Sequence, residues 1–162
     1  MNSNNLDIKN ILNLYKEKNY NSFIKLGLKL LKKNPKNYQL TYLIGLSYVN
    51  LQKYTEAEKY FDKLLYVQKK PEIFFIQANI HKQLKKYDSA IDQFNKIINQ
   101  SNSLSQNAFY HLGECYLKEE KKIEALSAFK KASEMNFNKK IKEDALLQYA
   151  KLGFEIGNPF ES

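Results

Sequence analysis

The feature that most constrains this fold is a self-similarity with a period of 33 to 35 residues. The residues that recur are Tyr54, Ala57 and Phe61, then Tyr87, Ala90 and Phe94, then Ala125 and Phe129. A period of this length is typical of stacked helix pairs, because one pair cannot bury its apolar face alone and packs against the next. The sequence therefore predicts an all-α fold of helical repeats, in which the recurring residues pack between helices.

Composition agrees with an all-α fold. Five Gly and three Pro are too few for a turn-rich β-fold of 162 residues. The hydrophobic fraction of 43% is ordinary for a folded chain. A chain of this length can form one continuous core, so we expect a single domain over residues 1–162.

The period divides the chain into four units followed by one further helix. The units cover about residues 4–37, 38–70, 71–103 and 104–138, and the last helix covers about 140–156. Gly45 stands inside an expected helix of the second unit, where a Gly costs about 1 kcal/mol relative to Ala. Its presence indicates close contact with the second helix of that unit, which carries Ala57 and Phe61. The chain is expected to reverse direction between these helices, at Gln52 and Lys53.

These units resemble the tetratricopeptide repeat, a helix–turn–helix unit of 34 residues. The matching residues are Ile44, Gly45, Tyr48, Ala57 and Phe61 in the second unit, and Phe109, Leu112, Gly113, Tyr116, Ala125, Phe129 and Ala132 in the fourth. The third unit departs from the pattern with Ala78 for the Gly and His81 for the Tyr; the degenerate first unit has Phe23 for the Ala and Gly27 for the Phe. The resemblance implies a right-handed α-solenoid of about four repeats plus a C-terminal helix, acting as a protein–protein interaction scaffold.

The C-terminal segment Asp144–Phe160 is similar to long multi-repeat bacterial envelope proteins of the same family, in which the chain continues into a further helix. The last helix is then either a cap or the first half of a fifth repeat, and Gly157 with Pro159 provides its stop. This resemblance implies an alternative function, a structural segment of a larger envelope or assembly protein without its own peptide ligand. In that case we expect self-association through the C-terminal helix and an envelope location.

The resemblance also implies that the first helix of each unit lines a concave groove, which holds an extended peptide or a partner helix. The groove candidates are Tyr42, Leu46 and Val49, then Phe75, Asn79 and Lys82, then Asn107, Tyr110, Glu114 and Leu117, and finally Leu147, Lys151 and Phe154. Tyr42, Phe75 and Tyr110 share one repeat position, so we expect an aromatic ladder with large contact area. Asn79 and Asn107 can bond a peptide backbone. The alternative is that the aromatic residues merely cover helix surfaces.

A terminal-carboxylate ligand is not expected in this groove. Members of the family that bind chaperones hold a carboxylate with cationic and amide side chains at set positions of the first helices. Those positions here are Tyr42, Leu46, Ile76, Asn107 and Tyr110, and none is cationic.

The charge of the chain is unevenly distributed. All 26 basic residues are Lys, and the formal net charge is +9. Residues 1–70 hold 13 Lys and 5 acids, whereas residues 71–162 hold 13 Lys and 12 acids. A basic half could meet an acidic protein, anionic lipid or nucleic acid. The absence of Arg argues against specific phosphate or nucleic-acid recognition, and we favour solvated outer helix faces as the interpretation.

No catalytic or metal-binding pattern stands out. His111, Glu114 and Cys115 have a helical ligand spacing, but Cys115 is more simply a small buried residue, so no metal and no cofactor is predicted. The chain has no Gly-rich phosphate loop, nucleophile elbow or paired-Cys motif, and an enzyme is not expected. His81 is expected to be structural.

Location is predicted only by default. Cys115 stands alone, so no internal disulfide is expected. The first ten residues lack a secretory pattern, and the longest hydrophobic-leaning stretch without charge, Asn37–Gln52, is too short and polar for membrane insertion. A cytoplasmic protein with protein or peptide partners is the expectation, and the sequence does not identify the partner.

Overall fold

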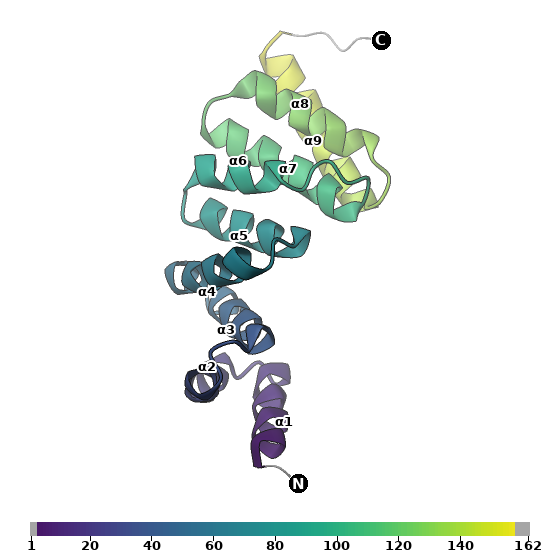
Figure 1. Cartoon of the computed structure of the whole chain (residues 1–162). Coiled ribbons are helices and arrows are strands. Elements are labelled where there is room, and N and C mark those ends of the chain that lie inside the picture. Colours follow the sequence, from purple (N-terminus) through teal and green to yellow (C-terminus); the bar gives the residue numbers. More distant parts are fainter. Residues whose placement is uncertain (1–2, 158–162) are drawn as a thin grey trace. The chain divides into compact units, whose positions relative to one another are not determined.

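The computed structural model describes residues 3–157, and the side chains of residues 10–157. That part of the chain forms nine α-helices and no strand (Figure 1). The helices are α1 (Ser3–Lys16), α2 (Tyr20–Lys33), α3 (Tyr38–Asn50), α4 (Tyr54–Val67), α5 (Pro71–Gln83), α6 (Tyr87–Asn95), α7 (Ser103–Lys118), α8 (Lys122–Glu134) and α9 (Lys139–Glu155). The all-α prediction is confirmed.

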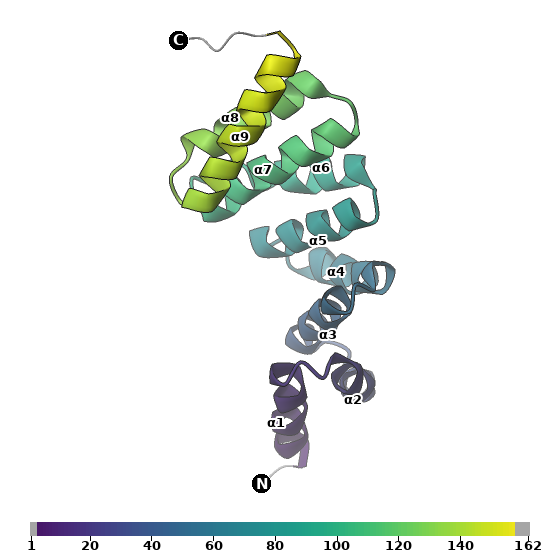
Figure 2. The same cartoon turned by 180° about the vertical axis from the view of Figure 1, so that it is seen from behind.

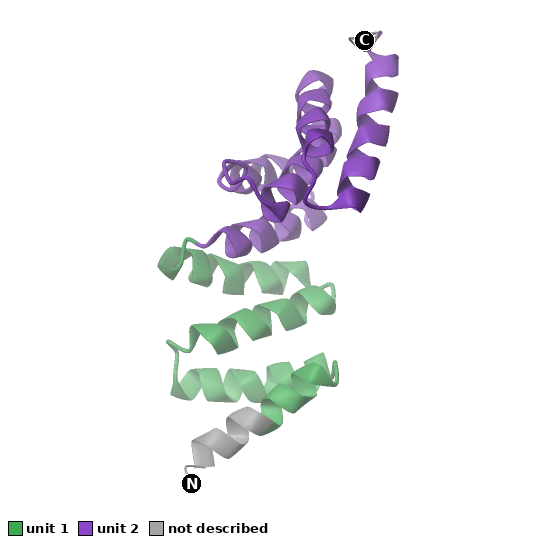
Figure 3. Ribbon diagram, turned by 90° about the vertical axis from the view of Figure 1, so that its right-hand side faces the viewer, with its two compact units in different colours: residues 1–69 green, residues 70–162 purple. Residues whose placement is uncertain are grey.

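The chain separates into two compact units (Figure 3). Unit 1 covers residues 1–69 and contains α1 to α4; unit 2 covers residues 70–162 and contains α5 to α9. Within each unit, consecutive helices pack against each other as antiparallel pairs. The prediction of a single domain over residues 1–162 stays a prediction.

One turn geometry joins the two helices of every pair. The residues with positive φ are Lys18, Gln52, Lys85 and Glu120, at φ values of 59°, 58°, 59° and 57°. In each turn the next residue's N–H donates to the carbonyl five residues earlier, at 2.9 Å; the pairs are Asn19 to Leu14, Lys53 to Tyr48, Lys86 to His81 and Lys121 to Tyr116. This bond satisfies a carbonyl that the helix end leaves unpaired, so the chain reverses tightly without a Gly. The expected reversal at Gln52 and Lys53 lies at one of these turns.

Asparagine caps four of the helices. The side chains of Asn19, Asn37, Asn102 and Asn138 accept hydrogen bonds from the backbone N–H three residues later. Such caps satisfy one of the free donors of a helix N-terminus and typically contribute about 1 kcal/mol. They explain locally why α2, α3, α7 and α9 begin where they do.

The repeated Phe residues lie at the centre of three helix pairs, α3–α4, α5–α6 and α7–α8. Phe61, Phe94 and Phe129 are completely buried. A Cβ added to Gly45 would lie 2.8 Å from the Phe61 ring, and one added to Gly113 would lie 2.6 Å from the Phe129 ring. The two glycines therefore allow the close helix contact that their presence in a helix predicts.

The last helix, α9, packs along α8 and also contacts α7 (Figure 2). The buried side chain of Gln106 on α7 fixes the link before it, because its Nε2 donates to the carbonyls of Ala132 and Met135 at 3.0 and 2.7 Å. Its Oε1 accepts from the Asn138 N–H at 2.7 Å. Helix α9 ends near Gly157, at φ +67°, whereas Pro159 of the predicted stop lies outside the described residues. None of the helices described is long and apolar enough to cross a membrane.

Candidate functional site

The three aromatic residues of the predicted ladder share one packing geometry. Each ring meets, edge to face, the buried Phe that lies 19 positions later in the same helix pair. The pairs are Tyr42 with Phe61 at 5.8 Å and 74°, Phe75 with Phe94 at 5.8 Å and 68°, and Tyr110 with Phe129 at 5.7 Å and 62°. Edge-to-face contact is a favourable arrangement for aromatic rings. These residues are thus partly packing residues, a role that the repeat pattern predicted for the recurring Phe residues.

Each of these aromatic rings also keeps part of its surface accessible. Tyr42, Phe75 and Tyr110 are all half-buried. Tyr42 belongs to unit 1, on α3 beside the half-buried Leu46, whereas Phe75 and Tyr110 belong to unit 2. A ladder that includes all three therefore stays a prediction, and Phe75 and Tyr110 are described together below.

In unit 2, the first helices α5 and α7 place the predicted groove residues on one surface, which we call the first-helix face. Its residues are Phe75, Asn79 and Lys82 on α5, and Asn107, Tyr110 and Glu114 on α7, at helical spacing on each helix. The two helices meet through Lys82, whose Nζ donates to Glu114 Oε2 at 2.7 Å. The structure thus joins two of the predicted residues, Lys82 and Glu114, directly, and the other four lie at helical spacing from them on the same two helices.

Glu114 is held as a carboxylate on this face. Burial by itself would raise its pKa, but hydrogen bonds from His111 and Lys82 outweigh burial and lower the pKa to about 2. His111 Nδ1 lies 2.7 Å from Glu114 Oε2 and 2.9 Å from Lys82 Nζ. Because Nδ1 carries one proton at most, its contact with Glu114 is a hydrogen bond when Nδ1 is protonated, and Lys82 then donates to Glu114. The charges of Lys82 and Glu114 therefore compensate each other within the cluster.

His111 joins the charged cluster to the aromatic rings. Its ring stacks on Phe94 at 5.7 Å and 29°, and also contacts Phe75 at 5.8 Å and Tyr110 at 5.6 Å. Burial raises the pKa of Tyr110, and the negative charges of Glu114 and Asp144 raise it further. The Tyr110 hydroxyl therefore stays neutral and can donate or accept a hydrogen bond.

The two predicted amide residues are anchored by their own helices. Asn79 Nδ2 donates to the Phe75 carbonyl at 2.9 Å, and Asn107 Nδ2 donates to the Ser103 carbonyl at 2.7 Å. Both side chains are half-buried. Neither Oδ1 has a hydrogen-bond partner among the described residues. The first-helix face thus presents two oriented acceptors.

Family models match most of the helical repeats. A tetratricopeptide repeat model matches residues 28–72, and the model of anaphase-promoting complex, cyclosome, subunit 3 matches residues 53–132. The chain belongs to the tetratricopeptide repeat family. No curated protein matches the chain.

Solved structures show the tetratricopeptide repeat fold directly. A tetratricopeptide repeat protein from Parabacteroides merdae has a TM-score of 0.80 at 21% identity, over 95% of this chain and 60% of that one. YrrB, described as a protein of this family with an unusual peptide-binding site, has a TM-score of 0.77 at 20% identity, over 95% and 78%. MamA from Desulfovibrio magneticus has a TM-score of 0.72 at 17% identity, over 98% and 97%. These similarities show an all-α helical-repeat solenoid, a fold that suggests a protein–protein interaction scaffold.

The remaining chemical candidates of this tetratricopeptide repeat chain are buried. Cys115 is completely inaccessible, and burial raises the pKa of its thiol to about 11, so the thiol stays protonated. His81 is buried on α5, with its Nε2 3.3 Å from Gln77 Nε2. Within the described residues, no group of three His, Cys, Asp or Glu side chains is placed to hold a metal ion.

Proposed function

We propose that this chain is a scaffold that holds an extended peptide or a partner helix against the first helices of unit 2, α5 and α7, on the first-helix face. The observation that carries the proposal is the pair of oriented amides on the first-helix face. Asn79 and Asn107 each use Nδ2 within their own helix and leave Oδ1 for a ligand N–H. The accessible parts of the Phe75 and Tyr110 rings lie on the same face.

This arrangement favours binding because the side chains are already held in place and lose little conformational entropy when a ligand binds. An amide that is already anchored loses less rotamer entropy when its oxygen accepts a ligand N–H. The Phe75 and Tyr110 rings are fixed in the same way by edge contacts to Phe94 and Phe129, and they offer apolar contact area. Peptide N–H donors with apolar side chains between them match both features.

Charge selects the ligand only weakly on this face. Lys82 and Glu114 neutralise each other at 2.7 Å, so neither is free to bind a ligand carboxylate or ammonium group. This supports a ligand recognised through its backbone and apolar side chains. The description of YrrB supports a peptide as the class of ligand, although at 20% identity it indicates nothing about the residues used here.

The test replaces the amides and keeps the aromatic packing. Peptides are selected from a random twelve-residue display library on the whole chain, and their dissociation constants are measured by fluorescence anisotropy. We expect Asn79→Ala with Asn107→Ala to weaken binding about tenfold, since two hydrogen bonds of about 0.5–1.5 kcal/mol are lost. This pair is preferable to Tyr42→Ala with Tyr110→Ala, which would remove ring contacts to the buried Phe61 and Phe129.

The matched control is Asn95→Ala with Asn99→Ala, because both of these asparagines are exposed and lie outside the first-helix face. It should leave the dissociation constants unchanged. Equal affinity of the Asn79, Asn107 variant and the wild type for every selected peptide would overturn the proposal.

A second candidate function is a structural segment of a larger array, in which a further repeat packs on α9. The supporting observation is the apolar exposure of α9, where Leu147 is 51% and Phe154 is 87% accessible. Self-association of the chain is then expected in sedimentation experiments, and Leu147→Lys with Phe154→Lys should abolish it. The control replaces Ile123 and Phe137, which are 66% and 51% exposed elsewhere in unit 2, with Lys. A wild-type chain that stays monomeric at high concentration would count against this candidate.

A further inference from the structure

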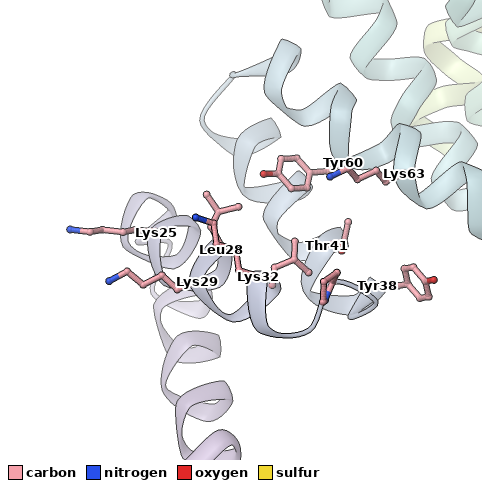
Figure 4. A pocket seen from close by; sticks show the side chains of 10 residues that line it. Lys25, Leu28, Lys29, Lys32, Tyr38, Thr41, Tyr60 and Lys63 are labelled. Atoms are coloured by element: carbon pink, nitrogen blue, oxygen red, sulfur yellow. The ribbon is translucent and has the colours of Figure 1, made fainter.

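Unit 1 contains a pocket of about 670 Å³ that the first-helix face does not include. It lies between the second helices α2 and α4 and the start of α3 (Figure 4). Lys25, Lys29 and Lys32 line it from α2, and Lys63 lines it from α4. Lys25, Lys29 and Lys32 are spaced along one side of α2, and in Figure 4 the ammonium groups of Lys25 and Lys29 point outward from it.

The positive charge of this pocket is not compensated. No acidic residue occurs between Glu17 and Glu56. None of the four lysines forms an ion pair with a residue whose side chain the structure describes. Lys63 instead lies over the Tyr60 ring at 5.8 Å. The four ammonium groups are therefore available to an anionic ligand.

The wall of the pocket is apolar and fixed. Leu28, Leu31 and Tyr60 are half-buried and pack against the core of unit 1. Tyr60 stacks on Tyr48, with ring centroids 5.5 Å apart and an interplanar angle of 23°. Thr41 donates its hydroxyl to the Asn37 carbonyl at 3.0 Å. A bound apolar side chain would therefore meet an aliphatic and aromatic surface that is held in place by the core of unit 1.

We propose that this pocket binds an acidic segment of a partner protein. One large apolar side chain of that segment enters the pocket, and carboxylates on either side of it pair with the lysines. A volume of about 670 Å³ falls within the range of pockets that bind small ligands, so it has room for one large apolar side chain together with its flanking backbone. The site lies in unit 1 and shares no residue with the first-helix face of unit 2, so it does not depend on the ligand proposed for that face.

A peptide fits this pocket better than a nucleic acid does. Nucleic-acid binding needs charges that follow an extended backbone and aromatic faces on which bases stack. Here the lysines line a single pocket, three from α2 and one from α4. The Tyr60 ring already stacks on Tyr48 and has Lys63 near it, and the chain has no Arg for bidentate phosphate contacts. An apolar wall within a lysine rim instead matches alternating acidic and apolar side chains.

The test uses a fluorescein-labelled peptide, Glu-Asp-Glu-Leu-Glu-Asp-Glu amide, and the same peptide with Ser in place of Leu. Binding to the whole chain is followed by anisotropy at two salt concentrations. We expect Lys25→Glu with Lys29→Glu to raise the dissociation constant of the Leu peptide about tenfold or more, because reversal replaces attraction with repulsion. The Ser peptide should bind the wild type about fivefold more weakly than the Leu peptide does.

The matched control is Lys16→Glu with Lys53→Glu, which changes the charge of unit 1 equally at exposed positions outside the pocket. We expect it to weaken binding less than about threefold, through long-range attraction alone. Equal effects of the two double variants, or equal binding of the Leu and Ser peptides, would overturn the proposal. A tighter binding of a single-stranded oligonucleotide than of the Leu peptide would also overturn it, if the Lys25→Glu, Lys29→Glu variant lost that oligonucleotide binding. The Asn79, Asn107 variant should bind the Leu peptide like the wild type, so this result and that of the first-helix face are separable.

Discussion

Units 1 and 2 share their packing and differ in how they use charge. In unit 1, Phe61 packs against Gly45 and the Tyr42 ring of α3; in unit 2, Phe129 packs against Gly113 and the Tyr110 ring of α7. The ring pairs agree within 0.1 Å in centroid separation, at 5.8 and 5.7 Å. The recurring residues thus specify one helix–helix arrangement in both units.

The charges follow no such repetition. Among residues 10–157, no lysine of unit 1 forms an ion pair with another residue of that range. Lysines of unit 2 pair with acids of the same unit, and these pairs are Lys82 with Glu114, Lys96 with Asp92, Lys121 with Asp88, Lys122 with Glu155 and Lys139 with Glu143. The repeat therefore constrains the apolar positions and leaves the surfaces free to differ, which allows the two units to bind partners of different chemistry.

The largest expected effect tests the shared packing. Gly113→Ala places a Cβ 2.6 Å from the Phe129 ring, and Gly45→Ala places one 2.8 Å from the Phe61 ring. Both rings are buried and cannot move aside freely, so we expect losses of about 1–3 kcal/mol in the free energy of unfolding, larger for Gly113→Ala. Urea denaturation followed by circular dichroism measures them.

Gly27→Ala is the matched control for these substitutions. Its Cβ would lie 3.3 Å from the end of the Ile44 side chain, which can shift slightly. Ala favours a helix by about 1 kcal/mol over Gly, so this variant should be neutral or slightly more stable. A loss at Gly113 no larger than at Gly27 would show that the packing of Phe129 on α7 does not require a Gly.

The next effect tests the difference in charge. The carboxyl of Glu114 has a pKa of about 2, below its ordinary value of 4.5, so it stabilises the fold above pH 4.5 and loses this contribution as the pH falls to 2. Because Glu114 is 38% exposed, solvent screening reduces the contribution to about 1–2 kcal/mol. Glu114→Gln should be less stable than the wild type at pH 7, and the difference should vanish near pH 2 in urea denaturation.

Glu143→Gln is the control for the ion pair. Glu143 is 64% exposed, and its Oε1 is 3.8 Å from Lys139 Nζ, so the pair contributes little in water. Its stability should match that of the wild type throughout the pH range. If Glu114→Gln behaved the same way, the compensated cluster of unit 2 would contribute no more than the exposed pairs.

The fold could be predicted from the sequence because the residues that pack the helices together recur at a regular spacing. Residues such as Phe61 and Phe129 fill equivalent spaces, and the period reveals them in a single chain. The candidate residues on α5 and α7 followed from the same register. Their ion pair did not, because Lys82 and Glu114 are 32 residues apart and the equivalent residues one unit earlier, Val49 and Asn79, carry no charge. A contact made once leaves no periodic signal.

The lysine-lined pocket could not be predicted for a related reason. The sequence shows an excess of Lys in residues 1–70, and outer solvated faces were the favoured interpretation. The pocket forms because α2 and α4 belong to consecutive helix pairs and bring Lys29 and Lys63 to the same space. The pattern of a single helix does not indicate that these residues, which belong to different helices, line the same pocket, nor that apolar side chains lie between them.

The smallest effect concerns the turns, which both units share. Gln52 and Glu120 have φ values of 58° and 57°, a conformation that strains a residue with a Cβ and that Gly adopts freely. Gly also increases the entropy of the unfolded chain, so we expect Gln52→Gly and Glu120→Gly each to gain only about 0.5–1 kcal/mol. Thermal denaturation should show this as a rise of about 1–4 °C in Tm.

The control for these turns is Lys59→Gly, in the middle of α4, which should instead lose about 1 kcal/mol in the free energy of unfolding. Equal gains at the two turns would show that backbone geometry is common to units whose charges differ, whereas a gain in one unit alone would limit the equivalence to the packing of Phe61 and Phe129.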